Sequence, residues 1–456
     1  MENLFIATAK YIFILLMAFY VFLSFVLLRD KNKKSYKNAL SVQSWMIYAI
    51  HLCGFIIIYM HDKKDTVIIF YGAQLIYFII FKGLFSVLYD EYYHAGLLNN
   101  TCMLLSVGFI MLSRLSYNKA IRQFVIVVAA SIFVLLIPSI INRMKALKYM
   151  RYIYCFAGIA FLAAVLIIGQ LSYGAKLSIE IAGFSFQPSE FVKILYVFFL
   201  ASLFQKSRRF KYVVISAIFA GMHVIILVLS HDLGNALIFF IVYIMMLYVA
   251  TCRFFYVIAG TIAGSGAACI AYRFFSHVRV RVQAYLDPWS FIDTGGYQVT
   301  QSLFAIGTGG LLGLGLYKGA PKTIPVVEED FIFSAISEEL GMIFAISLVI
   351  LYINCFICFI KISMKQTELF YKLIGLGLAV TYAVQTILTV GGAIKFIPST
   401  GVTLPLISYG GSSVLCTMIS FAIIQGLEVR RNVLEEAYEE DNDENDNKTY
   451  DNEDAE

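Results

Sequence analysis

The chain has 456 residues, of which 60% are hydrophobic and only 14% are charged. Its mean hydropathy of +0.78 lies far above that of soluble globular proteins, which excludes a water-soluble enzyme and gives no reason to expect a nucleic-acid partner. Apolar stretches of about 18–25 residues, long enough to cross a ~30 Å hydrocarbon layer as helices, recur from end to end. The composition therefore predicts an all-α polytopic membrane protein.

Thirteen apolar segments are predicted to span the membrane. The first is long and has no small-residue cleavage site behind it, so it is interpreted as a membrane helix and not as a cleaved signal peptide. The predicted spans are roughly 8–28, 43–61, 66–88, 97–114, 120–141, 151–171, 188–205, 211–229, 233–250, 254–275, 331–357, 370–392 and 405–427.

Five basic clusters follow odd-numbered spans, and the positive-inside rule places such clusters in the cytoplasm. They comprise Arg29, Lys31, Lys33, Lys34 and Lys37; Arg143, Lys145, Lys148 and Arg151; Lys206, Arg208, Arg209 and Lys211; Lys361, Lys365 and Lys372; and Arg430 and Arg431. This parity puts the N-terminus outside and the C-terminus in the cytoplasm. The acidic connection "YDEYYHAG" after the third span fits less well, so the helix count within residues 1–96 stays open.

Two polar segments interrupt the apolar pattern. The tail, residues 435–456, carries twelve acids and one lysine, and is predicted to be a disordered cytoplasmic tail. The 34 basic and 18 acidic residues outside it leave a net charge of +16, so the nominal +5 conceals a basic membrane body. The other segment, about 276–330, contains eight glycines between Gly295 and Gly319. Its apolar content predicts a folded loop that packs on the outer face of the bundle.

Five carboxylates crowd the end of this loop in "VVEEDFIFSAISEELG". Asp330 directly precedes an apolar run and could act as the N-cap of its helix. Asp330, Ser334, Ser337 and Glu338 follow helical spacing, so Glu338 would lie ~12 Å deeper along a polar stripe. A carboxylate inside a membrane needs a partner or a cavity. Pairing with a buried base is the structural interpretation for Glu338, whereas Asp330 at the mouth is expected to act on a substrate.

Other polar residues lie at the outer ends of predicted spans. Glu190 and Lys193 lie in "FQPSEFVKI", and "SHDLG" contributes Asp232. The Pro- and Gly-rich run "IPSTGVTLPLISYGGSS" follows Lys395; such a run breaks a helix, which membranes tolerate only where the backbone lines protein or water. Together with Arg279 and Arg281 at the start of the loop, these groups suit a phosphate-bearing, sugar-like or ionic ligand.

Four stretches resemble the signature of one family. "FQPSEFVKI", "DPWSFIDTGGYQVTQSLFAIGTGGLLGLGL", "DFIFSAISEELG" and "STGVTLPLISYGGSS" are similar to motifs of the SEDS proteins, of the RodA, FtsW and SpoVE type, in the same order along the chain. The resemblance covers about 97–431, within a ten-helix core assigned to residues 97–434. Residues 1–96 then form an N-terminal extension of about three helices.

The resemblance implies a peptidoglycan glycosyltransferase on the outer face of the bacterial cytoplasmic membrane. Such an enzyme polymerises lipid II into β-1,4 glycan strands with inversion and releases undecaprenyl pyrophosphate. The family's essential aspartate falls on Asp330, which would be the general base. Candidate substrate-binding residues are Arg279, Arg281, Gln298, Gln301, Ser302, Lys193, Glu190, Asp232, Glu338, Glu339, Lys395, Ser408, Gly410 and Gly411. A class B penicillin-binding protein, which is a transpeptidase, is the implied partner.

Cofactors are less well defined. A divalent cation, Mg²⁺ or Mn²⁺, is a hypothesis that no ligand spacing supports. Cys355 and Cys358 form a CxxC, but it lies in the apolar "LYINCFICFI" and is best interpreted as packing.

The sequence also departs from the family pattern. His231 stands in "SHDLG" where the family usually has Pro, and Glu328 and Glu329 stand where His-Thr is usual. The extra acids should raise the pKa of Asp330 through like-charge repulsion.

Two alternatives stay open from the residues alone. A flippase or transporter for lipid-linked sugars would use a similar charged cavity, although no inverted repeat is evident. A scaffold that recruits a transpeptidase is the other, but it would not need Asp330 and its motif. The sequence does not distinguish roles in division, elongation or sporulation.

Overall fold

The computed structural model describes residues 2–29, 33–172, 175–181 and 184–453. Lys31 of the first basic cluster and the last three residues of the tail lie outside these ranges. Within them, thirteen helices are long and apolar enough to cross a membrane. This confirms the predicted class and the thirteen spans, three of which precede residue 94.

The spanning helices follow the predicted order. The first three are α1 (Glu2–Leu27), α2 (Lys33–Asp62) and α3 (Asp65–Tyr89). The others are α4 (Ala95–Leu115), α5 (Tyr117–Arg143), α6 (Arg151–Ile168), α7 (Pro188–Lys206), α8 (Phe210–Leu229), α9 (Leu233–Thr251), α10 (Phe255–Phe274), α14 (Met342–Met364), α15 (Leu369–Ala393) and α16 (Gly411–Glu453). A short 3₁₀ helix, η1 (Lys145–Tyr149), joins α5 to α6.

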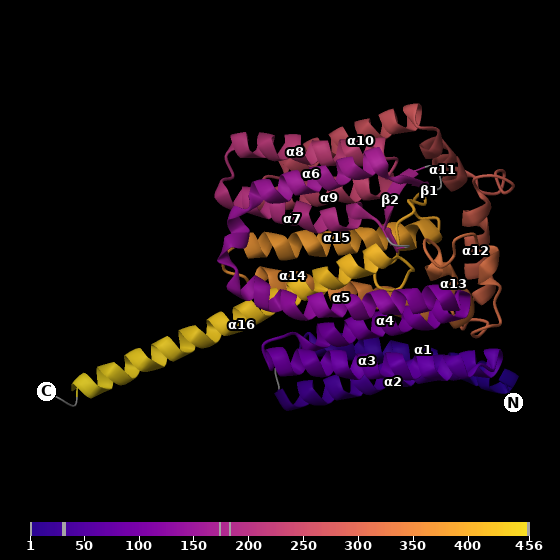
Figure 1. Cartoon of the computed structure of the whole chain (residues 1–456), viewed down its shortest axis with the longest axis horizontal. Coiled ribbons are helices and arrows are strands. Elements are labelled where there is room, and N and C mark those ends of the chain that lie inside the picture. Colours follow the sequence, from indigo (N-terminus) through magenta and orange to yellow (C-terminus); the bar gives the residue numbers. More distant parts are fainter. Residues whose placement is uncertain (1, 30–32, 173–174, 182–183, 454–456) are drawn as a thin grey trace.

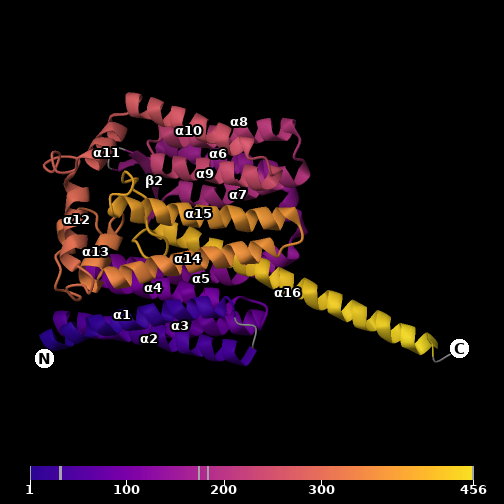
Figure 2. The ribbon, with the colours of Figure 1, turned by 180° about the vertical axis from the view of Figure 1, so that it is seen from behind.

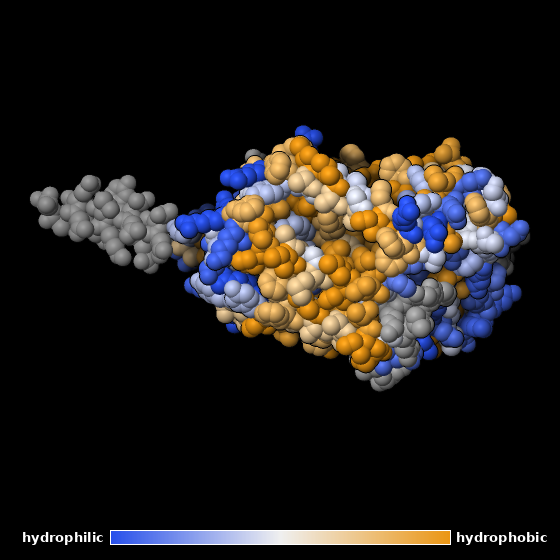
Figure 3. Space-filling model, turned by 90° about the horizontal axis from the view of Figure 1, so that it is seen from above, coloured by the Kyte–Doolittle hydropathy of each residue, from blue (hydrophilic) through white to orange (hydrophobic). Residues whose placement is uncertain are grey.

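The helices form one bundle with two polar ends. Helices α1 to α3 make a layer beside α4, and both the N-terminus and the long loop lie at the same end of the bundle (Figure 1). The C-terminal helix leaves the opposite end, as the reverse view also shows (Figure 2). Figure 3 shows an apolar belt between hydrophilic surfaces at the two ends. This is the pattern expected when the bundle axis follows the membrane normal.

The long loop is folded, as predicted. It contains α11 (Ser276–Leu286), α12 (Tyr297–Gly309), the 3₁₀ turn η2 (Pro321–Thr323) and the short helix α13 (Ile332–Leu340). The buried Ser302 hydroxyl joins three elements: it lies 2.6 Å from the Ser334 hydroxyl of α13 and donates to the Ala393 carbonyl at the end of α15, at 2.7 Å. The loop is therefore fixed to the bundle by buried polar contacts as well as by apolar packing.

The eleventh span does not begin at residue 331. The run breaks at Gly341, which has a φ of +90°, into α13 and α14. The free carbonyls of Glu338 and Glu339 accept hydrogen bonds from the N–H groups of Leu314 and Gly315 at 3.0 and 2.8 Å. The prediction of one continuous helix, with Glu338 ~12 Å deeper in the membrane, is therefore wrong. The glycine-rich loop supplies the partners that a helix break requires.

Residues 394–410 form an irregular segment between α15 and α16, so the last span begins at Gly411 and not at residue 405. The segment enters the bundle: the Tyr352 hydroxyl donates to the Pro405 carbonyl at 2.7 Å. Tyr352 lies ten residues into α14, which corresponds to a depth of ~15 Å. The predicted helix break is confirmed, and the exposed backbone faces protein, as such breaks require.

The connection before α7 contains a small sheet that the sequence analysis missed. Strands β1 (Gln170–Ser172), β2 (Ala175–Ile181) and β3 (Phe184–Phe186) pair antiparallel in the order β1-β2-β3. The predicted span 151–171 therefore ends at Ile168, where α6 stops.

The tail differs from the expected disorder, because α16 continues as one helix to Glu453. The tail contains neither Gly nor Pro to end a helix that begins inside the bundle.

Candidate active site

Asp330 is the second-last residue of the loop before α13. Its backbone N–H donates to the Val326 carbonyl at 3.3 Å. The N-cap position belongs to Phe331, which makes no side-chain cap bond. The prediction that Asp330 caps this helix is therefore wrong, because the helix starts at Ile332. The Asp330 carboxylate therefore does not cap the N-terminus of α13.

The Asp330 carboxylate faces Arg281 across Gly401. A Cβ built on Gly401 would lie 3.6 Å from Asp330 Oδ2 and 3.4 Å from Arg281 Nη2. Arg281 also donates from Nη1 to the Ser399 carbonyl at 3.3 Å. Among the described residues, no basic nitrogen lies within 4.0 Å of the Asp330 carboxylate. The glycine thus leaves a small gap between one carboxylate and one guanidinium.

The surroundings of Asp330 tune its protonation. Burial raises the pKa of Asp330 to about 6; the negative charge of Glu329 adds to the rise, and Arg281 opposes it. The expected effect of a neighbouring acid is confirmed for Glu329, although burial contributes more. A carboxylate with a pKa near the working pH is well suited to general base catalysis.

Lys119 pairs with the two acids that precede Asp330. Its ammonium lies 2.9 Å from Glu328 and 3.2 Å from Glu329, and 5.0 Å from the centre of the Tyr409 ring. These contacts join the start of α5, the loop and the irregular segment. Glu328 and Glu329 therefore share one basic partner, which leaves one net negative charge beside Asp330.

The irregular segment 394–410 contains three of the predicted site residues, Lys395, Ser408 and Gly410. The Ser408 hydroxyl donates to the Glu329 carbonyl and accepts from the Leu404 N–H at 2.9 Å. The Gly410 N–H donates to Gln123 at 3.1 Å, and Gly411 begins α16. Ser408 and Gly410 hold the segment against the loop and α5, so they lie in the site as positioning groups.

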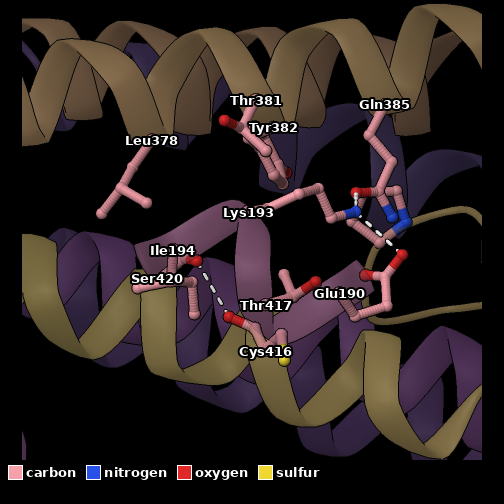
Figure 4. Close-up of a pocket in the computed structure, with 11 residues that line it drawn as sticks. Glu190, Lys193, Ile194, Leu378, Thr381, Tyr382, Gln385, Cys416, Thr417 and Ser420 are labelled. Carbon is pink, nitrogen blue, oxygen red and sulfur yellow. Dashed lines mark hydrogen bonds and ion pairs between the residues drawn. The ribbon is translucent and has the colours of Figure 1, made fainter. Parts of the chain in front are cut away.

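Glu190 and Lys193 form a buried ion pair inside the bundle (Figure 4). Lys193 Nζ lies 2.8 Å from Glu190 and donates to Gln385 Oε1 at 2.8 Å, and Gln385 Nε2 donates to the Thr403 carbonyl at 3.1 Å. The adjacent cavity of about 20 Å³ has room for about one water. The pair therefore connects to the irregular segment through Gln385 and does not lie at an open surface.

Asp232 is engaged structurally. It is the N-cap of α9, where it accepts from the Asn235 N–H at 3.2 Å and from the side chains of Asn235 and Ser189 at 2.9 and 3.1 Å. Burial raises the pKa of Asp232, while these hydrogen bonds oppose the rise. The nearby Gly234 packs on the Thr400 carbonyl, so Asp232 fixes α9 beside the irregular segment.

The expected pairing of Glu338 with a buried base is wrong: the base pairs with Glu339. Arg114 of α4 lies 2.9 Å from Glu339, whereas Glu338 accepts from the Ala320 N–H at 2.9 Å. Burial raises the pKa of Glu339 to about 7 in spite of Arg114, and burial also raises the pKa of Glu338. Neither carboxylate contacts Asp330; both hold the loop to the core.

The remaining predicted residues lie on the loop and at the start of the irregular segment. Arg279 is exposed, and Gln298, Gln301 and Lys395 are half-buried. In the part of the chain that the structure describes, their side chains have no hydrogen-bond partner, so they are available to a ligand. Ser302, in contrast, is buried and has a structural role.

Sequence reasoning missed Lys119, Arg114 and Gln385. Arg114 and Lys119 border a short connection between two predicted spans, where a charge looks like an ordinary helix end. Gln385 is a single polar residue within an apolar span. That feature could have marked it as a residue facing the interior.

The described residues contain no group of three or more His, Cys, Asp or Glu placed to hold a metal ion. A divalent cation beside Asp330 would therefore need oxygen ligands from a bound diphosphate as well.

Comparison with known proteins gives consistent matches. A family model described as "Cell cycle protein", for FtsW, RodA and SpoVE, matches residues 94–433. The peptidoglycan glycosyltransferase RodA of Mycobacterium bovis is 36% identical over 367 residues, which cover 72% of this chain and 76% of that protein. A probable peptidoglycan glycosyltransferase FtsW of Geobacter sulfurreducens is 33% identical over 58% of this chain and 72% of that protein.

Two solved structures share the fold. One chain, from a study of how a peptidoglycan synthase complex coordinates polymerization and crosslinking, has a TM-score of 0.64 and 25% identity, covering 75% of this chain and 98% of its own. The rod shape determining protein RodA of Thermus thermophilus has a TM-score of 0.55 and 23% identity, over 74% of this chain and 97% of that chain. Residues 1–93 precede the region that the family model matches.

Proposed function

Because the chain belongs to the FtsW, RodA and SpoVE family and is a peptidoglycan glycosyltransferase, we propose that it polymerises lipid II with Asp330 as the general base. One observation carries the proposal. The Asp330 carboxylate lies beside a gap that Gly401 leaves open, across from Arg281, and its pKa is raised to about 6. Glu328, Glu329 and Glu339 have basic partners, and Glu338 is bound by the Ala320 N–H. Asp330 is therefore the carboxylate of this cluster that is available for chemistry.

The proposed step is an inverting glycosyl transfer. Asp330 accepts the proton of the acceptor sugar's 4-hydroxyl as that oxygen bonds to the anomeric carbon of the donor. The bond from that carbon to the pyrophosphate oxygen breaks, and undecaprenyl pyrophosphate leaves with the electron pair. Arg281 stabilises the negative charge that develops on the leaving group. Arg279 and Lys395, whose side chains have no hydrogen-bond partner among the described residues, are further candidates for this role.

The reaction face is assigned to the outside of the membrane. The basic clusters of the sequence lie at the end of the bundle where α5 ends and α16 leaves, and the positive-inside rule assigns that end to the cytoplasm. The loop with Asp330 lies at the other end, beside the N-terminus (Figure 1). Lipid II on the outer leaflet would then reach Asp330 directly.

A transpeptidase partner is also proposed. The support is the structural similarity to a chain from a synthase complex that couples polymerization to crosslinking. A class B penicillin-binding protein would supply the crosslinking activity that no residue of this site provides. Co-purification of such a protein with the full chain would identify it.

The test is the Asp330→Asn variant, reconstituted in liposomes with lipid II. We expect glycan synthesis to fall by at least ~100-fold, the range for loss of a general base. The fold should persist, because replacing a carboxylate whose pKa is raised by burial removes a cost of ionisation. The melting temperature in detergent checks this point.

The matched control is Asp293→Asn, which changes an exposed aspartate of the same loop and should leave synthesis unchanged. Near-normal glycan from Asp330→Asn would refute the assignment. Movement of lipid II across the bilayer by the wild type without any glycan product would favour the flippase instead.

A further inference from the structure

The N-terminal extension contacts the loop at Tyr317. The Tyr317 ring stacks on His61 at the end of α2, with 3.9 Å between ring centres and 20° between planes. On the core side, the guanidinium of Arg114 lies 4.3 Å from the centre of the same ring. One loop side chain therefore lies between a residue of the extension and a residue of the core.

The backbone at Tyr317 is held in an uncommon conformation. Its φ of +67° lies in the left-handed region, which is rare for a bulky residue and persists only when the surroundings enforce it. The Tyr317 N–H donates to Glu339 Oε1 at 3.1 Å, and the same oxygen lies 2.9 Å from Arg114. The two ring contacts and this hydrogen bond together fix the residue.

The extension makes a second contact with the loop. Lys10 of α1 donates from Nζ to the Gly313 carbonyl at 3.1 Å. Gly313 lies just before the residues whose N–H groups pair with the carbonyls of Glu338 and Glu339. Contacts from both α1 and α2 thus reach the loop segment 313–320 that supports the end of α13.

Helix α13 connects this segment to Asp330. Its C-terminal residues Glu338 and Glu339 are bound to the loop and to Arg114, and it begins two residues after Asp330. A nine-residue helix behaves as a rigid rod ~13 Å long. A shift of its far end is therefore transmitted to the position of the carboxylate.

We propose that the three-helix extension holds the catalytic loop in place, with Tyr317 as the positioning residue that transmits its support to α13. The inference rests on the proposed role of Asp330. It gives the extension, which precedes the region shared with the family model, a function in the reaction. Tyr317 itself does not contact the substrate.

Four single variants of the full-length chain in nanodiscs test the proposal. His61→Ala removes the stacking contact with Tyr317. Tyr317→Ala removes the contacts with both His61 and Arg114. Tyr317→Phe keeps both ring contacts and removes only the hydroxyl, which makes a long hydrogen bond of 3.5 Å to Asp62. Tyr59→Ala removes an exposed ring two residues earlier in α2 that stacks on no described aromatic ring. Each is measured by hydrogen exchange of residues 310–340 and by the rate of lipid II polymerisation from pH 5 to 8.

We expect the backbone amides of residues 313–320 to exchange hydrogen faster in His61→Ala and Tyr317→Ala. We also expect kcat to fall about tenfold with little change in KM, because misplacing a catalytic group by ~1 Å can reduce the rate by up to ~100-fold. Loosening should also expose Asp330 to water. The acid limb of their kcat profile should then move to lower pH, because Glu329 and Arg281 act on the carboxylate in opposite directions and burial is the largest cause of its raised pKa. Tyr317→Phe and Tyr59→Ala should match the wild type.

Unchanged exchange and kcat in His61→Ala would overturn the proposal, whether or not Tyr317→Ala folds. Faster exchange with an unchanged kcat and acid limb would overturn it as well, because the contact would then be merely structural. The base assignment is tested apart from this. If Asp330 is not the base, Asp330→Asn stays active while His61→Ala still loosens the loop; if the extension has no such role, Asp330→Asn is inactive while His61→Ala behaves as wild type.

Discussion

At the scale of single residues, the environment of each carboxylate determines what it does. Glu328, Glu329 and Glu339 have a basic partner within 3.2 Å, and Asp330 has none among the described residues. A carboxyl group whose pKa is higher in the folded protein binds more protons folded than unfolded. For Asp330 this holds between pH about 4 and 6, so its contribution to stability is lost as pH rises through that window. The raised pKa of Asp330 therefore lowers stability above pH about 6, but it gives the site a base whose pKa is near the working pH.

Glu329→Gln should change the pH dependence without removing the base. Loss of the neighbouring negative charge lowers the pKa of Asp330. The acid limb of the polymerisation rate should therefore shift by up to about one pH unit toward lower pH. Glu328→Gln is the matched control. Glu328, like Glu329, pairs with Lys119, but its charge is not among the causes of the raised pKa of Asp330. Equal shifts in the two variants would contradict this account.

The sequence made Asp330 and Arg281 candidates, Asp330 through the family resemblance, and the structure places the two side chains on either side of Gly401. The sequence could not predict that Arg114 pairs with Glu339 and not with Glu338. Adjacent glutamates on one helix look alike in sequence, and only the packing of α4 against α13 distinguishes them. Gln385 was missed for the same reason: its partners Lys193 and Thr403 are brought to it by the fold.

At the scale of elements, the irregular segment 394–410 organises the site. Its residues contact the loop, α5, α9 and α15 within seventeen positions of the chain. Gly401, with a φ of +72°, is the position where it faces both Asp330 and Arg281. A side chain there would occupy the gap that the proposed reaction needs.

Gly401→Ala should therefore reduce the polymerisation rate more than its loss of stability alone would explain. The left-handed backbone costs about 1–2 kcal/mol for an alanine. The added methyl would make ordinary contacts with Asp330 and Arg281, at 3.6 and 3.4 Å, so the fold tolerates it while the gap narrows. Gly310→Ala is the control, because Gly310 has a φ of +56° and no neighbour within 4 Å. Its ψ of −155° makes an alanine there costly to stability, but the rate should not fall. Melting temperature and polymerisation rate measure the two effects; equal rates would refute the role of the gap.

The spans were predictable because hydrophobicity is a local signal, whereas their interruptions were not. The apolar run continues through Gly341, and the break there depends on hydrogen bonds from Leu314 and Gly315, about 25 residues earlier in the chain. The three strands before α7 are short, and their alternation is too brief to separate from the end of a membrane helix. The high charge of residues 435–453 is typical of a disordered segment, whereas their lack of Gly and Pro is compatible with a helix, so composition alone does not decide between the two.

At the scale of the whole molecule, buried polar residues join the extension to the core. Asn100 of α4 accepts from Tyr20 and Ser24 of α1 at 3.0 and 3.3 Å and donates to Asn354 of α14 at 2.9 Å. Hydrogen bonds between helices matter here because lipid provides no hydrophobic drive for association. The contact of the extension with the loop depends on this attachment.

Asn100→Leu should weaken the attachment of the extension before the core unfolds. Two of the hydrogen bonds of Asn100 reach the extension, and at ~0.6 kcal/mol each they amount to about 1 kcal/mol. Cys102 and Cys355, which are free and buried, should then react with a thiol reagent faster at temperatures below the main transition. Thr101→Val is the control, because the Thr101 hydroxyl bonds only the Leu97 carbonyl of its own helix at 2.9 Å. If both variants label at the wild-type rate, Asn100 does not join the two parts. If Asn100→Leu labels faster and also shows faster hydrogen exchange in the loop, the contact of the extension with Tyr317 depends on the hydrogen bonds of Asn100.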